Sequence, residues 1–553
     1  MRLASLHLVL LPCLFTSFSL SLSLSSFVKG TMWWGSAETL GRILWGVVGL
    51  LLLLRAWKGL EWLWWTPRRL ERALRGQGLR GTRYRFLHGD LKENARLNKE
   101  AWSQPMPFSH DIVPRVTPFF HRAIKENGKL SITWFGPVPR VTIMNPEWVR
   151  EVLSNKFGHF AKPQINPLGR LLATGLANYE GEQWAKHRRI LNPAFHLEKL
   201  KRMLPAFSAC CGELVNRWEK SIGSLGYYEL DVWPELQNFT GDVISRTAFG
   251  SSYEEGRRIF QLQAEQAELL IPAVQTVYIP GYRFLPTPIN NRRKKIDREV
   301  RALLRGIIEK REKAINLGEA SNGDLLGLMI ESNLKHFQEH GNSKNTRMTT
   351  EEVIGECKLF YFAGQETTSV LLTWTMVVLS MHPSWQVRAR EEVLELFGKN
   401  RPDYDGLNRL KIVTMILYEV LRLYPPAIQL NRRTYKTMKV GDITCPAGVL
   451  LLLPVIFIHH DPEFWGKDAS EFNPERFAEG ISKASKDQLA FFPFGWGPRT
   501  CIGQSFALLE AKMGLSMILQ HFSFELSPSY VHAPYTVLTL QPQHGAQIRL
   551  RRV

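Results

Sequence analysis

The chain has 553 residues, of which 44% are hydrophobic, and it carries a formal net charge of +19 at pH 7. This length is enough to bury a large core in one or two domains. The charge suits nucleic acid, a membrane surface or an acidic protein as a partner, but nucleic acid is the weakest candidate because no zinc-finger spacing or aromatic RNA-binding motif stands out. The six cysteines form no CxxC pair, which argues against a disulfide scaffold and suits a reducing compartment.

The first 84 residues are predicted to anchor the chain to a membrane. Residues 1–31 are rich in Leu and Ser and are interpreted as a signal-like segment or an upstream extension, with Met32 as an alternative start. Residues 32–66 hold an apolar run bordered by tryptophans and predict the membrane anchor. A buried core helix fits poorly with this N-terminal position and arginine-rich exit. Residues 67–84 are predicted to be a basic linker, whose arginines keep the C-terminal side in the cytosol by the positive-inside rule.

The globular body is predicted to follow this linker. Residues 130–136 and 140–144 alternate around a Gly-Pro turn, which predicts a β-hairpin. Residues 162–174 contain two prolines and a glycine and predict an irregular loop. The next segment is basic and helical, and it places Trp184 and Arg188 one turn apart on the same face.

The middle of the chain has helical periodicity with one specific interruption. Residues 279–288 form an aromatic, proline-rich loop, and residues 291–295 restart a basic helix. The basic run is interpreted as a solvated face, or alternatively as part of a pocket mouth that touches the membrane. Residues 335–347 are polar and predict a connector within the domain.

The longest predicted helix begins at Thr349, where Glu352 completes a capping box, and it ends before Pro383. Its middle, residues 363–368, is a polar Ala-Gly-Gln-Glu-Thr-Thr insertion in an otherwise core-like sequence. The glycine and the Thr367 hydroxyl, which can bond the carbonyl four residues back, are predicted to open the helix locally. A site that must admit a small ligand and deliver protons would use this combination.

An E-x-x-R pair, Glu419 and Arg422, lies in a predicted apolar helix that would bury it. Because a buried charge needs partners, a second cation is expected nearby, and Arg476 in the Asn473–Phe477 segment is the candidate. The region between them is predicted to contain short strands around turns.

The most informative stretch is Phe494–Gly503, which reads FGWGPRTCIG and precedes the opening of a helix. Glycines on both sides of Cys501 would let the backbone close against a flat ligand, and N–H groups at the helix start would hold the thiolate ready for a metal. Arg499 is suited to pair with an acidic group on that ligand. A lone cysteine would instead be interpreted as a buried structural residue. Here the stretch matches F-x-x-G-x-R-x-C-x-G at every fixed position.

This stretch resembles the haem-binding loop of the cytochrome P450 superfamily, and the other motifs follow in that family's order. The resemblance implies a mainly α fold with small β-sheets and an N-terminal transmembrane anchor, residues 85–553 being the haem-thiolate catalytic domain. The implied iron ligand is Cys501, and the other implied contacts to haem b are Trp184, Arg188, Arg432, Arg499, Phe494 and Gly364. Arg433 competes with Arg432 for its assignment. The implied proton-delivery residues are Thr367 and Glu366, and the implied structural triad is Glu419, Arg422 and Arg476.

The activity implied by this resemblance is that of an NADPH- and oxygen-dependent monooxygenase. Electrons would come from a membrane-bound NADPH-cytochrome P450 reductase, because the chain shows no flavin or nicotinamide fingerprint of its own. The basic composition suits docking of an acidic partner. The anchor implies a single-pass protein of the endoplasmic reticulum membrane with its catalytic domain in the cytosol.

Two other functions stay open. One is an oxygen-independent haem-thiolate isomerase or dehydratase, against which the acid-threonine pair counts, and the other is a non-catalytic haem or lipid-binding protein. Dependence of turnover on NADPH and oxygen would separate the three.

Three finer features are similar to the plant clan that oxidises terpenoids, including triterpenoid, iridoid and gibberellin-type skeletons. They are the anchor region without a Pro-Pro-Gly-Pro hinge, the FAGQETT run and the FGWGPR run. The predicted pocket walls are mostly apolar, which indicates a lipophilic substrate. These walls are residues 163–172, 271–284, 360–366, 427–430 and 537–540.

Overall fold

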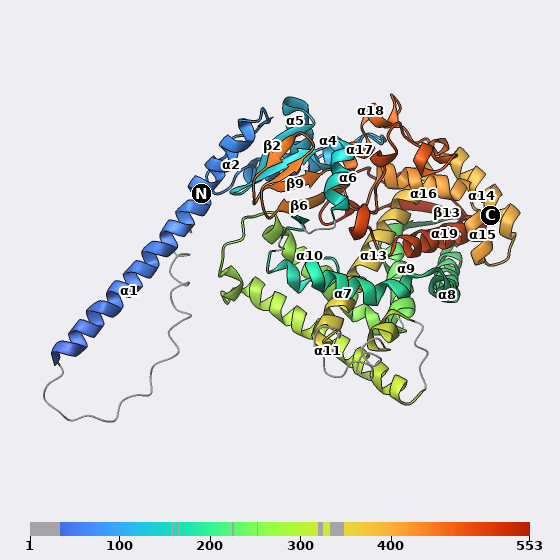
Figure 1. Cartoon of the computed structure of the whole chain (residues 1–553). Helices are drawn as coiled ribbons and strands as arrows, with labels where there is room; N and C mark the ends of the chain where they lie inside the picture. Colours follow the sequence, from blue (N-terminus) through green and yellow to red (C-terminus); the bar gives the residue numbers. More distant parts are fainter. Residues whose placement is uncertain are drawn as a thin grey trace.

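The computed structural model describes residues 34–155, 159–163, 166–223, 226–250, 253–318, 324–331 and 348–553. Within these ranges, a mainly helical body with four small sheets is joined to one long N-terminal helix that stands away from it (Figure 1). The predicted fold class, mainly α with small β-sheets and an N-terminal apolar helix, is confirmed. The predicted connector at 335–347 lies outside the described residues.

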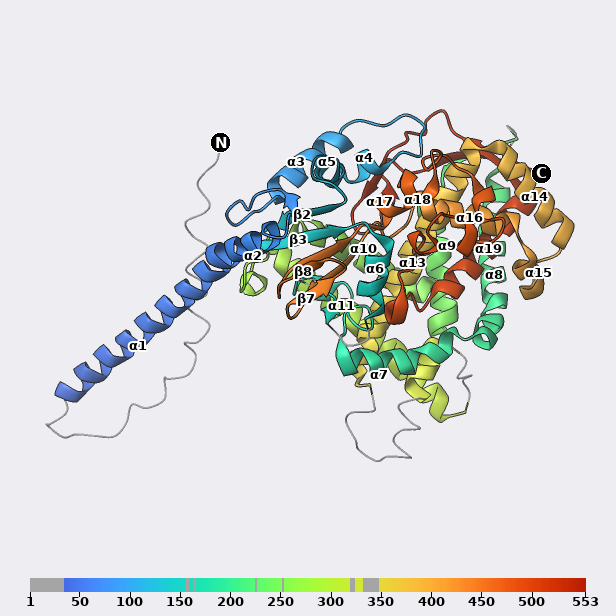
Figure 2. The same ribbon diagram turned by 45° about the horizontal axis from the view of Figure 1, so that its top comes forward.

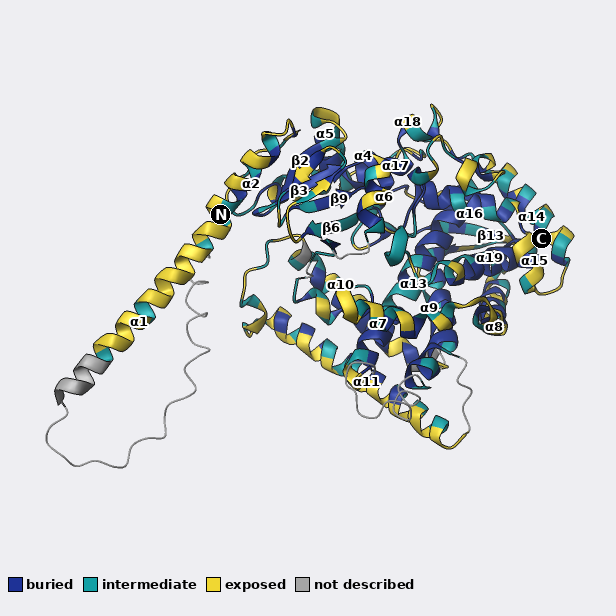
Figure 3. Ribbon diagram, viewed as in Figure 1, coloured by how far each residue is buried: buried dark blue, intermediate teal, exposed yellow. Residues whose placement is uncertain are grey.

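The N-terminal helix is a continuous rod. Helix α1 (Trp34–Leu60) passes through a π-helical turn, η2 (Glu61–Trp65), into α2 (Thr66–Arg75). In the described part of the chain, one segment is long and apolar enough to cross a membrane: Gly41–Arg75, which has a mean hydropathy of 1.7 over a window with no buried residue. The side chains of α1 described from residue 41 on are almost all exposed (Figure 3). This helix is therefore compatible with a membrane anchor.

The predicted basic linker, residues 67–84, is largely folded onto the body. Helix α2 buries Leu70 and Leu74, and Arg75 donates a hydrogen bond to the Thr82 carbonyl at 2.8 Å. The basic side chains of α2 thus lie on a helix whose other face belongs to the core.

The largest sheet confirms the predicted hairpin. Its strands β2 (Leu130–Phe135) and β3 (Val138–Ile143) pair antiparallel around Gly136, which has a φ of +57°. The sheet has the order β1-β2-β3-β9-β6-β4, where the other strands are β1 (Arg80–Gly81), β9 (Leu450–Leu453), β6 (Leu430–Thr434) and β4 (Phe160–Ala161). The smaller sheets join β10 (Phe522–Leu526), β13 (Gln547–Arg552) and β5 (Tyr228–Asp231); β11 (Pro534–Thr536) and β12 (Leu540–Pro542); and β7 (Met438–Val440) and β8 (Ile443–Cys445).

The remaining helices make up most of the body. They are α3 (Leu91–Trp102), α4 (Val113–Val116), α5 (Pro118–Asn127), α6 (Pro146–Ser154), α7 (Gly181–Leu191), α8 (Leu197–Ser221), α9 (Val232–Phe249), α10 (Tyr253–Val274), α11 (Pro288–Asn316), α13 (Thr350–Met381), α14 (Pro383–Phe397), α15 (Tyr404–Arg409), α16 (Ile412–Leu423), α17 (Val455–His459), α18 (Pro462–Trp465) and α19 (Gln504–His521). The β2–β3 hairpin lies at the end of the body nearest the rod, and α14 and α15 lie at the far end (Figure 2).

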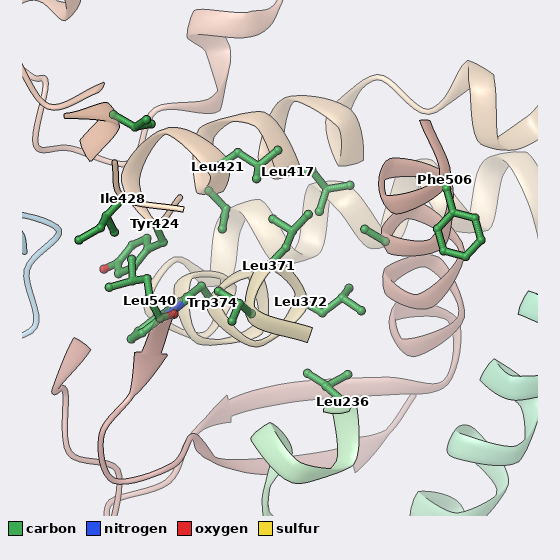
Figure 4. Packing of buried hydrophobic residues seen from close by; sticks show 14 of the residues in the cluster. Leu236, Leu371, Leu372, Trp374, Leu417, Leu421, Tyr424, Ile428, Phe506 and Leu540 are labelled. Atoms are coloured by element: carbon green, nitrogen blue, oxygen red, sulfur yellow. The ribbon is translucent and has the colours of Figure 1, made fainter. Parts of the chain in front are cut away.

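Helix α13 runs through the core, and its ends are set by local signals in the sequence. Thr349 Oγ1 accepts from the Glu352 N–H at 3.1 Å, and the Glu352 carboxylate accepts from the Thr349 N–H at 2.8 Å, which confirms the capping box. The Trp374 ring stacks on Tyr424 with centroids 4.6 Å apart, in a cluster that also draws on α9, α16, α19 and β12 (Figure 4). This packing fixes α13 relative to the segments that carry the other predicted site residues.

Candidate functional site

The loop before α19 holds Cys501 through its own backbone. The Cys501 N–H donates to the Phe494 carbonyl at 2.9 Å, and Gly495 and Gly497 have φ angles of +75° and +70°. A Cβ on Gly497 would lie 2.5 Å from the Leu153 carbonyl oxygen of α6. Its left-handed backbone and its close packing on α6 therefore require a glycine at this position.

Cys501 is the exposed member of the five cysteines in the described part of the chain. Burial raises the pKa of its thiol, whereas the Gly503 N–H and the positive charges of Arg188 and Lys162 lower it. Many protein atoms surround the thiol, yet its own surface remains accessible. We infer that the thiol faces an internal space of the fold. Nearby cations and a backbone donor favour the thiolate, which is the form that binds metals.

Four cations gather near this sulfur. Burial, together with the charges of Arg432 and Arg499, lowers the pKa of Lys162 to about 7, and burial lowers the pKa of Arg432 to about 10. Arg188 is the fourth cation, and the carboxylate that counters the group is Glu180, which accepts from Arg499 Nη2 at 2.7 Å. The cluster therefore has an excess of positive charge, and a ligand with two carboxylates would stabilise its charged form.

The predicted Trp184 and Arg188 lie on α7 and contact the cysteine loop directly. Arg188 Nη1 donates to the Thr500 carbonyl at 3.0 Å, and the Arg499 guanidinium lies 4.4 Å from the centre of the Trp184 ring. Between them on α7, the buried His187 contacts Glu356 of α13, with 2.6 Å between Nδ1 and Oε1. Sequence reasoning missed this contact, which fixes α7 against α13.

The two neighbouring arginines of strand β6 differ in burial. Side chains alternate along a strand, and Arg432 is buried whereas Arg433 is partly exposed. Burial and, after it, the charge of Arg499 lower the pKa of Arg432, which places Arg432 beside Arg499 in the cation cluster. Lys162 belongs to the same cluster but was not predicted, because it sits in a loop without periodicity.

Helix α13 stays α-helical through residues 363–368, so the predicted local opening is wrong. Thr367 Oγ1 does donate to the Ala363 carbonyl at 2.8 Å, as expected. A Cβ on Gly364 would lie 2.7 Å from Cγ1 of Ile244, so this glycine lets α9 approach closely. Packing against α9 supports the helix where the glycine and the hydroxyl alone would weaken it.

Glu366 is buried on α13 and is held from outside its own helix. Thr539 Oγ1 donates to its Oε1 at 2.5 Å, and Gln541 Nε2 donates to the same oxygen. Thr539 belongs to the predicted pocket wall 537–540, but its bond to Glu366 and that of Gln541 were not predicted, because the β11–β12 hairpin lies more than 170 residues further along the chain.

Glu366 lines a cavity of about 1000 Å³ between α8, α9, α10, α13 and the β11–β12 hairpin. Phe362 and Val537 come from predicted walls, but Gln237 and neighbouring charged residues give a polar side that was not predicted. The predicted walls at 163–172 and 271–284 mainly line a separate cavity of about 390 Å³. Residues 427–430 are in the lining of neither cavity.

The structural triad is assembled as expected. Arg422 donates to both Glu419 oxygens, at 2.7 and 2.6 Å, and Arg476 Nε lies 3.5 Å from Glu419 Oε1. Both Glu419 and Arg422 are fully buried. The Asn473 N–H also donates to Glu419, which ties η6 (Pro474–Phe477) to α16.

Comparison with known proteins agrees with this geometry. The family model for Cytochrome P450 matches residues 115–548. The chain belongs to the cytochrome P450 family. It is 71% identical to Cytochrome P450 CYP72A616 of Paris polyphylla, covering 93% of this chain and 99% of that protein. It is 56% identical to Cytochrome P450 72A15 of Arabidopsis thaliana, covering 90% and 96%. The retinoic acid-bound cyanobacterial CYP120A1 shares the fold, with a TM-score of 0.68 at 24% identity over 79% of this chain and 94% of that chain.

Family membership confirms several predictions. This P450 is a plant haem-thiolate monooxygenase of the CYP72 clan, and it uses haem with reductase-supplied electrons, molecular oxygen and a lipophilic substrate. The cation cluster and the accessible thiol fit a haem, whose two propionates supply the anionic groups that the cluster lacks.

Proposed function

We propose that this P450 hydroxylates a terpenoid, of triterpenoid, iridoid or gibberellin-like skeleton, that already carries a polar group. The cavity beside Glu366 supports this most directly. Its volume of about 1000 Å³ is at the upper end for small-molecule sites, as a polycyclic skeleton requires. Phe239, Phe260 and Phe362 contribute apolar surface, and Gln237 contributes an amide group suited to a hydroxyl or carboxyl on the substrate.

We propose that the Cys501 thiolate would bind the haem iron. The Gly503 N–H and the Arg188 charge favour its thiolate, and the accessible sulfur leaves room for the metal. Arg188, Arg432 and Arg499, joined by Lys162, would bind the propionates, while Trp184 would pack beside them. When bound, the haem supplies oxygen activation and transfer of one oxygen atom to the substrate.

We propose Glu366 and Thr367 as the proton-delivery residues. Glu366 lines the large cavity and can exchange protons with water there. The Thr367 hydroxyl is fixed by its bond to the Ala363 carbonyl, so its oxygen remains free to accept a proton or a hydrogen bond on the same helix face. Phe494 would pack at the cysteine side, and the backbone of α13 at Gly364 would lie against the cofactor.

The location proposed is the endoplasmic reticulum membrane, with the body in the cytosol. The Gly41–Arg75 segment supports a single membrane span, and its C-terminal end carries Arg68, Arg69 and Arg72. The net charge of +19 favours docking of an acidic, membrane-bound NADPH-cytochrome P450 reductase.

The test is to co-express the chain with a plant NADPH reductase in yeast microsomes and to supply triterpenoid and diterpenoid acids. We expect an NADPH- and oxygen-dependent product heavier by one oxygen atom in mass spectrometry. Cys501→Ser should abolish both the product and the thiolate spectrum of the reduced carbon monoxide complex. Cys445→Ala, at a buried cysteine of strand β8, is the matched control and should keep both. No product from any terpenoid, with a normal thiolate spectrum, would refute the substrate class.

A further inference from the structure

The carboxylate of Glu366 accepts two hydrogen bonds from a β-hairpin near the C-terminal end of the chain. We call these bonds, from Thr539 and Gln541, the clasp. Thr539 Oγ1 and Gln541 Nε2 both donate to Oε1, and Thr539 Oγ1 also accepts from Gln541 Nε2 at 3.3 Å. Glu366 and Thr539 are only 8% and 7% exposed. Hydrogen bonds to a carboxylate in such surroundings are strong, because little water competes for it.

The hairpin is held in place without this clasp. The Leu540 carbonyl accepts from Trp374 Nε1 at 2.8 Å, and the Leu540 N–H donates to the Pro426 carbonyl at 3.2 Å. Strands β11 and β12 also pair, with Thr536 opposite Leu540. The backbone beside Thr539 is therefore fixed to α13 and to the segment after α16, so loss of the Thr539 hydroxyl should leave its position unchanged.

Both donors end on the same oxygen of Glu366. Oε1 is thereby committed to the hairpin, and the side chain loses rotamer freedom. Oε2 receives neither bond, and Glu366 lines the cavity of about 1000 Å³ together with Gln541 and Tyr535. One carboxylate oxygen is thus available for water in the cavity while the other fixes the orientation.

We propose that Thr539 and Gln541 are positioning residues that hold Glu366 so that its Oε2 exchanges protons with cavity water. This inference rests on the proposed role of Glu366 in proton delivery. Val537 and Leu538, at the tip of the same hairpin, line the same cavity. Contact between a substrate and this tip would therefore change the geometry of the clasp. It would thereby change the fraction of NADPH electrons that end in product.

The test uses the full-length, haem-loaded P450 with its reductase and a pentacyclic triterpenoid acid as the probe. Thr539→Val removes the hydroxyl at nearly constant volume, Thr539→Ser restores it, and Gln541→Met removes the amide. Thr536→Val changes a threonine on the opposite strand and is the matched control. We expect the hydrogen peroxide released per NADPH to rise severalfold in Thr539→Val and Gln541→Met. It should return to near the parent value in Thr539→Ser and stay unchanged in Thr536→Val.

A second measurement does not depend on turnover. Thermal unfolding midpoints of the parent, Thr539→Val, Glu366→Gln and the double variant form a cycle, and a clasp predicts that the two changes are not additive. If Glu366→Gln raises the hydrogen peroxide released per NADPH but Thr539→Val leaves this ratio unchanged, the inference is overturned and the role of Glu366 stays intact. An unchanged ratio in both variants would overturn the proposed role of Glu366 and the inference with it.

Discussion

Replacing Arg422 with alanine is expected to destabilise this P450 by about 3–5 kcal/mol, because it leaves a buried carboxylate without its main partner. Arg422 is fully buried, donates twice to Glu419, and also donates to three backbone carbonyls in the segment from α17 to η6. After the substitution, Glu419 keeps the Asn473 N–H and Arg476, whose Nε is 3.5 Å away. These two partners compensate only part of the charge and hydrogen bonding that Arg422 gives to Glu419.

The expected loss can be converted into a shift of the unfolding midpoint. For a body of roughly 470 residues, an unfolding entropy near 2.1 cal/mol/K per residue gives a decrease of about 3–5 °C. Because chains of this size often unfold irreversibly, variants should be compared at one scan rate. The loss of the thiolate carbon monoxide spectrum on heating, in microsomes, provides the readout.

Two variants serve as controls for Arg422→Ala. Arg422→Lys keeps the charge but not the planar fork, so an intermediate shift is expected. Arg388→Ala removes a surface ion pair with Glu475, both side chains being more than 40% exposed, and should cost less than about 1 kcal/mol. Equal midpoints for Arg422→Ala and Arg388→Ala would refute the argument that burial makes the Glu419–Arg422 pair important.

Three further predictions concern the site and the response to acid. Thr367→Ala should keep haem bound but release more peroxide per NADPH, because a hydroxyl for proton delivery is lost; normal coupling would contradict this role. Arg432→Ala should lose haem faster on gel filtration than Arg433→Ala, because only Arg432 is buried in the cation cluster. Burial lowers the pKa of His110 from 6.5 to about 3. Between these two pH values the unfolded chain binds more protons than the folded chain, so the free energy of unfolding decreases as the pH drops from 6.5 towards 3. His110→Gln should therefore flatten the acid dependence of the unfolding midpoint, followed by tryptophan fluorescence, and an unchanged slope would argue against this contribution.

Local signals in the sequence predict much of the fold. The capping box at Thr349 and Glu352 and the break at Pro383 set the ends of α13 within one residue. The Gly-Pro turn places the β2–β3 hairpin correctly. These features depend on residues a few positions apart, whose preferences act before the chain is folded.

The parts of the site that the sequence does not predict depend on contacts between distant segments. Thr539 and Gln541 reach Glu366 because β12 packs against α13, and nothing in their local sequence indicates these two bonds. Lys162 joins the cation cluster in the same way. The predicted opening of α13 at Gly364 was wrong for a related reason, because helix propensity does not include the support that α9 provides.

As a membrane anchor, the unbroken rod of α1, η2 and α2 would couple the orientation of the body to that of the bilayer. Leu70 and Leu74 fasten one end of the rod to the core, and no loop separates them from the apolar part. A lipid bilayer of different thickness changes the tilt of a spanning helix. Here such a tilt would swing the whole catalytic body, except where the π-helical turn at Glu61–Trp65 gives a place to bend. Membrane thickness would thereby change the inclination of the body relative to the lipid surface.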